Sequence, residues 1–121
     1  MLGVDGALTP GRHLRVYAFC AAASTADVVV LAINVARGNA LPLALANATL
    51  AALPRAEYRF SATGGDNATV LMLNGNVLVL TKSGELPALV PAVVTTGSPA
   101  VLPPRSAALL VYRGANAAAC V

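Results

Sequence analysis

The side chains that could carry acid–base chemistry in this 121-residue chain are few and scattered. General acid–base catalysis uses carboxylates that lie close together or whose surroundings favour proton exchange. The carboxylates here are Asp5, Asp27, Glu57, Asp66 and Glu85. Four of them fall at expected strand ends or turns, and Glu57 stands between Arg55 and Arg59, which would hold it ionised. The sequence therefore predicts no catalytic residue.

The single histidine does not indicate a metal site. His13 begins an expected strand, and no Cys, Asp or Glu stands at a metal-ligand spacing from it. A surface or strand-edge histidine is therefore favoured over a ligand or a base. The Gly64-Gly65 pair completes neither glycine-rich phosphate-binding motif and is interpreted as a turn. No cofactor and no metal are expected.

The two cysteines stand far apart along the chain. Cys20 closes a strand-like run, and Cys120 is one residue from the carboxyl end. An even cysteine count in a loop-rich chain favours a disulfide, which would tie the last strand to an early one. Asn-Ala-Thr acceptor motifs at Asn47 and Asn67 indicate the same oxidising, glycosylating route. Two free buried cysteines and chance acceptor motifs are the alternatives.

The composition is that of one folded domain. Apolar residues make up 57% of the chain and charged residues 11%, which is far from the composition of disordered segments. The net charge is +3, but the basic residues are dispersed, so no nucleic-acid partner is expected. No apolar run reaches the roughly 18 residues of a membrane-spanning helix. The first residues lack the pattern of a signal peptide, so we expect a piece of a longer protein.

Glycine, proline and asparagine divide the chain into runs of about four to eight residues, the length of short strands in a β-sandwich. Strands are expected over residues 13–20, 27–34, 41–45, 56–62, 69–73, 77–80, 90–95 and 107–113. Asn74-Gly75 predicts a type I′ hairpin turn, which needs positive φ at both positions. Residues 44–53 could form a helical turn, although the motif at Asn47 favours an exposed loop.

Two strands have informative alternation. In residues 55–60 the charged side chains share one face and the apolar ones the other, which predicts a strand with its charged side in water. Residues 28–33 are apolar on both faces, as are residues 70–73 and 107–111. One face can fill the core, and the other needs either a partner domain or covering loops.

Several of these segments, in this order, resemble the carboxyl-terminal β-sandwich domain of plant-type heparanase-like proteins, the endo-β-glucuronidases of glycoside hydrolase family 79. Residues 14–20 (LRVYAFC) resemble the family's L-R-x-Y-x-x-C strand, and residues 30–34 (VLAIN) resemble its aliphatic-Ile-Asn strand. The family's E-Y…L-N-G segment is matched by 57–58 (EY) and 70–75 (VLMLNG), and its closing loops by 84–87 (GELP), 90–91 (VP), 102–106 (LPPRS) and 119–120 (AC). The resemblance covers about residues 1–121 and rests on the order of the motifs.

The resemblance implies a fold and a pairing. Residues 1–12 would be a leader or linker from a missing barrel, and residues 13–121 an all-β, antiparallel β-sandwich of about eight short strands. Cys20 and Cys120 would take the positions of the family's disulfide within this domain. The sandwich would be the accessory domain of a (β/α)₈-barrel glycosidase whose barrel is absent from this sequence.

The resemblance also implies a function for the parent protein. In the family, two glutamates on the upstream barrel carry out retaining hydrolysis of β-glucuronide bonds in glycans or proteoglycans, and no position here matches either one. This domain would have that barrel as its partner and would support its folding, secretion and activity. Glycan substrate would bind to the barrel and not to this domain directly. The parent would be secreted or extracellular, by a cell-wall, apoplastic or vacuolar/lysosomal route, and the chain alone would be inactive.

Two other hypotheses stand beside this one. The chain could be a freestanding β-sandwich module that binds glycan or protein, or a non-expressed gene fragment. Glycan-binding sandwiches usually present a platform of aromatic rings. The aromatic residues here are Tyr17, Phe19, Tyr58, Phe60 and Tyr112, and at least two of them are expected to face inward, which weakens the glycan-binding hypothesis.

Overall fold

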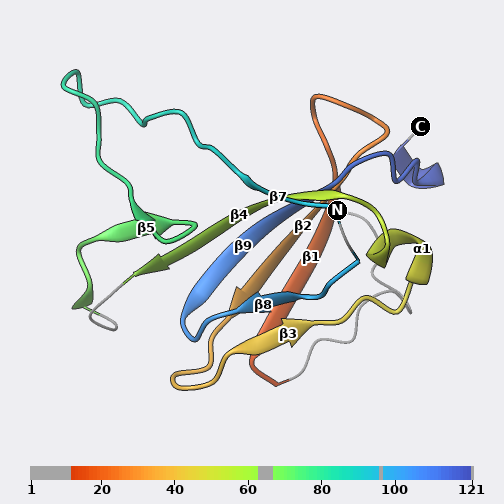
Figure 1. The fold of residues 1–121 in the computed structure, drawn as a ribbon, viewed down its shortest axis with the longest axis horizontal. Helices are drawn as coiled ribbons and strands as arrows, with labels where there is room; N and C mark the ends of the chain where they lie inside the picture. Colours follow the sequence, from red (N-terminus) through yellow and green to blue (C-terminus); the bar gives the residue numbers. More distant parts are fainter. Residues whose placement is uncertain (1–11, 63–66, 96, 121) are drawn as a thin grey trace.

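The computed structural model describes residues 12–62, 67–95 and 97–120 of the chain (Figure 1). The described strands, in chain order, are β1 (Leu14–Cys20), β2 (Val28–Asn34), β3 (Leu41–Leu43), β4 (Arg55–Ala62), β5 (Leu71–Leu73), β6 (Asn76–Val77), β7 (Ala92–Val94), β8 (Ala100–Leu102) and β9 (Ser106–Tyr112). The helical elements with described bounds are α1 (Ala48–Ala51) and the 3₁₀ turn η2 (Ala118–Cys120). Every described strand pair is antiparallel. The expected all-β fold is confirmed; the leader expected over residues 1–12 lies almost wholly outside the described residues.

The main sheet has seven strands in the order β1-β2-β9-β4-β5-β6, with β7 pairing with the other end of β4. Its last strand in sequence, β9, lies between β2 and β4 and pairs with both over most of their length. These runs are rich in valine, leucine and isoleucine, whose branched side chains pack well on a pleated surface. The centre of the sheet is therefore built from three segments distant in sequence.

A second, two-stranded sheet of β3 and β8 lies across one face of the main sheet (Figure 1). Leu43, Ala100 and Leu102 from this sheet join the inward residues of β1, β2 and β9 in one buried cluster. Val30 of β2 and Leu110 of β9 are completely buried at its centre. The core thus lies between two unequal layers, and we call the covered side of the main sheet its inner face.

Asn34 joins the two layers at the end of β2. Its side chain is buried, and its Nδ2 donates to the carbonyl oxygens of Leu102 at 3.0 Å, Pro103 at 3.0 Å and Asn39 at 2.9 Å. Its Oδ1 accepts from the backbone N–H of Ala36 at 2.9 Å. Because a buried amide must find partners, these bonds fix the position of β8 relative to β2.

The strand prediction misses one element, β8. Only three residues long and flanked by prolines, Ala100–Leu102 was expected to be part of a loop. Its pairing with β3 comes from residues that are about sixty positions apart, which local patterning does not reveal. Each of the eight expected strands overlaps a strand of the structure, although the one expected over residues 77–80 shares only Val77 with β6.

The tight turn at Asn74-Gly75 forms as expected. Both residues have positive φ, 51° and 83°, and Met72 and Leu73 pair with Val77 and Asn76 across it. A chain segment of residues 78–91, which we call the arm, runs from this hairpin to β7 and stands away from the sheets (Figure 1). The arm exposes large aliphatic side chains, Val79, Leu80, Leu86, Leu89 and Val90.

The expectation for β4 is wrong in its orientation. Arg55 and Glu57, predicted to face water, are 3% and 5% exposed and lie on the inner face, because they pair with Tyr112 and Leu110 of β9. Tyr58 and Phe60, on the other side of the strand, are only half-buried. Alternation correctly separates the two sets, but it does not indicate which set faces the core.

Candidate functional site

The structure brings the two cysteines together. Cys20 ends β1 and Cys120 ends η2, and their Cα atoms are 5.5 Å apart, a separation compatible with a disulfide. The cysteines are 100 residues apart in sequence, so a bond here would enclose nearly the whole described chain. The carboxyl-terminal segment would then be fastened beside the end of an edge strand.

Both expected glycosylation sites are exposed. Asn47 precedes α1 as its N-cap, and its Oδ1 accepts from the N–H of Leu50 at 3.0 Å. Residues 44–53 were expected to form either a helical turn or an exposed loop, and the structure shows a short helix in an exposed position. Asn67 is exposed in a short turn before β5. Glycan attachment at Asn47 and Asn67 stays a prediction.

Asp27 is engaged by the chain that follows β9. Its Oδ1 accepts from the N–H of Gly114 at 2.9 Å, and its Oδ2 accepts from Nη1 of Arg113 at 2.9 Å. The N–H of Gly114, and then Arg113, hold the pKa of this carboxyl below its ordinary value. Asp27 is therefore a structural carboxylate at the start of β2.

Glu57 is also paired, as expected, with the arginines on either side of it. Its Oε1 accepts from Nε of Arg55 at 2.8 Å, and its Oε2 lies 3.6 Å from Nε of Arg59. Two cations thus surround one buried anion, which leaves an excess of one positive charge on the inner face of β4. The ion pairs make this buried carboxylate tolerable.

The remaining candidates lie apart from these. Glu85 lies on the arm, where its N–H donates to Thr81 Oγ1 at 3.1 Å, and His13 is exposed just before β1. Asp5 and Asp66 lie outside the described residues. Within the described ranges, no three His, Cys, Asp or Glu side chains are grouped as a metal site would require. No helix in this part of the chain is long and apolar enough to cross a membrane.

The uncovered side of the main sheet carries rows of apolar side chains. The strand register aligns Tyr17, Leu31, Leu109 and Tyr58 in one row across β1, β2, β9 and β4, with Phe19, Val29 and Val111 in the row on one side and Ile33, Ala107 and Phe60 in the row on the other. None of these ten side chains is buried, whereas Val28, Val30 and Ala32 on the inner face are. The same rows also contain Ala56, which is 4% exposed, and the exposed Arg15. We call this ten-residue surface the open face.

The open face contains most of the aromatic residues of the chain. Tyr17 and Phe19 of β1 are each 38% exposed, and Tyr58 and Phe60 of β4 are half-buried. All four share this face, although at least two aromatics were expected to point inward. The inward orientation holds for Tyr112, which lies on the inner face. The sequence signal that indicated this surface was the run of residues 28–33, which is apolar on both faces of its strand.

Comparison with known proteins does not place the chain in a family. No protein-family model matches it, and no curated protein matches it. What the chain does must therefore be inferred from the open face, the buried charges and the resemblance of its segments.

Proposed function

We propose that this chain is the non-catalytic β-sandwich domain of a secreted, heparanase-like glycoside hydrolase of family 79, and that it packs through its open face against the (β/α)₈ barrel of its parent. The order of the motifs from residues 14–20 to 119–120 supports the family. The observation that carries the proposal is the open face itself. It is an apolar sheet surface opposite a face that already contains the core.

The inverted β4 strengthens this inference. A strand that faces water on one side usually places its charged residues there. In β4 the charged residues Arg55 and Glu57 lie inside, and the apolar Tyr58 and Phe60 lie outside. Exposed apolar patches of this kind mark interaction surfaces. The side chains of β4 therefore favour a second protein layer over the open face.

The distribution of the aromatic rings favours a protein surface over a glycan as the partner. Tyr17 and Phe19 lie on β1, while Tyr58 and Phe60 lie on β4, three strand spacings or about 14 Å away. The surface between the two pairs is aliphatic, with Leu31 and Leu109 at its centre. Aliphatic centres with aromatic neighbours are typical of protein interfaces, whereas sugars stack on exposed rings.

The partner surface continues beyond the sheet. Val93 of β7 pairs with Ala56 in the same row as Val111, and it is 71% exposed. The arm joins β7 and adds Leu86 and Val90, also 71% exposed each. A docked barrel would cover both surfaces and bury these exposed side chains.

Self-association of the isolated chain tests the proposal. Without its partner, the open face should bring copies together at micromolar concentration and bind an apolar dye. The double variant Phe19→Lys/Val93→Lys should shift the protein toward monomer in analytical ultracentrifugation and reduce dye binding. Val101→Lys is the matched control, because Val101 is 48% exposed on β8, away from the open face.

A monomeric wild-type chain with no dye binding would contradict the proposal and favour the freestanding module. The parent is tested separately by sequencing the transcript upstream of the Met1 codon. An open frame that encodes a barrel with two catalytic glutamates is expected. Stop codons there would instead indicate a gene fragment.

A further inference from the structure

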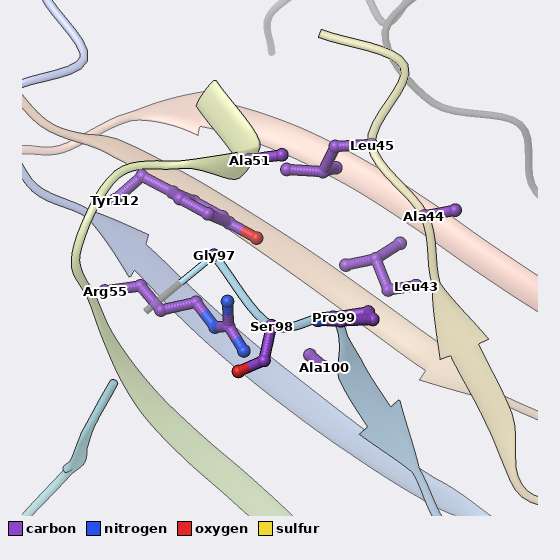
Figure 2. Close-up of a pocket in the computed structure, with 10 residues that line it drawn as sticks. All are labelled: Leu43, Ala44, Leu45, Ala51, Arg55, Gly97, Ser98, Pro99, Ala100 and Tyr112. Carbon is purple, nitrogen blue, oxygen red and sulfur yellow. The ribbon is translucent and has the colours of Figure 1, made fainter. Parts of the chain in front are cut away.

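A cavity of about 210 Å³ lies between the layers, on the opposite side of the main sheet from the open face (Figure 2). Its floor is formed by buried residues, Arg55 of β4, Tyr112 of β9, Leu43 of β3 and Ala100 of β8. Its rim is formed by exposed residues, Ala44, Gly97, Ser98 and Pro99. A polar floor beneath an accessible rim has the arrangement of a binding site.

Two polar groups point into the cavity from adjacent strands. Figure 2 shows the guanidinium of Arg55 and the hydroxyl of Tyr112 directed toward it, and the register places these two residues opposite each other. Within the described part of the chain, the Tyr112 hydroxyl makes no hydrogen bond. Burial raises the pKa of this hydroxyl, so it stays protonated and can donate.

The charge at the floor favours an anion. The contacts of Arg55 with Glu57 use Nε and Nη2 and meet a single carboxylate oxygen, whereas a guanidinium carries five N–H donors. Arg59 adds a second cation beside Glu57, and its buried Nε has no hydrogen-bond partner in the described structure. Of these charged side chains, Arg55 alone is among the described residues that line the cavity, so it is the cation that an anion in the cavity would meet.

The walls and the size restrict what the anion can be. Leu43, Leu45, Ala51, Pro99 and Ala100 give the cavity apolar walls. Its volume lies below the range of about 300–1,000 Å³ that is common for sites of larger ligands. The single guanidinium at the floor suits a monoanion, and the walls suit a short hydrocarbon body.

We propose that this cavity binds a small monocarboxylic acid, with its carboxylate on Arg55 and the Tyr112 hydroxyl and its apolar body against Leu43, Leu45 and Pro99. The proposal does not depend on the parent enzyme. The site faces away from the open face, so it would stay accessible when a partner covers that face.

The test is an NMR titration of the ¹⁵N-labelled chain with sodium hexanoate, which has a carboxylate and a short chain. Saturable shifts are expected for the amides of residues 43–45, 97, 98, 100 and 112. Hexan-1-ol, which keeps the chain without the charge, and sulfate, which lacks the chain, should each bind at least tenfold more weakly. Equal responses to hexanoate and hexan-1-ol, or no saturable shift with hexanoate, would overturn the proposal.

Variants locate the site without disturbing the core. Tyr112→Phe removes one hydroxyl and should weaken hexanoate binding about tenfold, the usual effect of losing a hydrogen bond to a charged group. Ala44→Trp should block the exposed rim and abolish binding. Ala46→Trp is its matched control, because Ala46 is exposed on the same loop but does not line the cavity. Binding that survives Ala44→Trp, or is lost equally in both tryptophan variants, would also refute the assignment.

Discussion

Removal of the Cys20–Cys120 bridge should cost this domain a large part of its stability. The two cysteines are 100 residues apart, and closing a loop of that length lowers the entropy of the unfolded chain. The chain-entropy relation gives about 4.7 kcal/mol at 25 °C for such a loop. Net stabilities of small domains are about 5–15 kcal/mol, so the reduced protein should be close to unfolding.

The perturbation is the double variant Cys20→Ser/Cys120→Ser, compared with the oxidised wild type in urea. A domain of this size has an m-value of about 1–3 kcal/mol/M, so a loss of about 4.7 kcal/mol should lower the midpoint by about 1.6–4.7 M. Circular dichroism at 218 nm follows the loss of β-structure. The reduced wild type should match the double variant, and a reductant should leave the double variant unchanged.

Two results would refute this reasoning. Two titratable thiols in the folded, unreduced wild type would mean that the bridge does not form. A midpoint that falls by less than about 0.5 M would mean that the bridge fastens only the carboxyl-terminal turn. Hydrogen exchange separates these cases, because local detachment would expose the amides of 115–120 and leave those of β2 and β9 protected.

Two further predictions concern polar side chains that position the strands. Asn34→Asp should destabilise the domain by about 3–5 kcal/mol in urea unfolding, because it removes buried donors that face three carbonyl oxygens. The control Asn39→Asp alters an exposed side chain and should have little effect on stability. Equal effects of the two substitutions would contradict the role of Asn34 in joining the two layers. Asp27→Asn should destabilise the domain at pH 7, and the difference from wild type should shrink as pH falls below 3.8, because the lowered pKa of Asp27 stabilises the fold above that ordinary value and this contribution is lost as pH falls through the folded pKa. A pH-independent difference between Asp27→Asn and wild type in thermal unfolding would contradict it.

Strand positions and the tight turn could be predicted because they depend on neighbouring residues. Asn74-Gly75 accepts positive φ wherever it occurs, and the punctuation by glycine and proline limits the strands on both sides. The second sheet could not be predicted in this way. β8 has three residues, and it is held by Leu41–Leu43 and by the side chain of Asn34, all distant in sequence.

The candidate sites show the same division. The cysteine pair was predictable from the even cysteine count, and the position of Glu57 between two arginines was predictable from their spacing along the strand. The cavity was not, since its two polar groups, Arg55 and Tyr112, meet only because β9 inserts beside β4. Period-two alternation places Arg55 and Glu57 on one face, but the choice of face depends on which residues β9 brings opposite them.

The two proposed sites lie on opposite faces of one sheet, and this arrangement makes them separable. The proposed docking surface uses Phe19 of the open face and the neighbouring Val93, and the cavity uses Tyr112 and Ala44, so no residue belongs to both. Substitutions more than about 7–10 Å apart without shared partners act almost independently. Phe19→Lys/Val93→Lys should therefore leave hexanoate affinity unchanged, and Ala44→Trp should leave self-association unchanged. If either the double variant or Ala44→Trp alters both hexanoate affinity and self-association, the sheet transmits changes between its faces. The buried Arg55–Glu57 pair would then be the connection to examine.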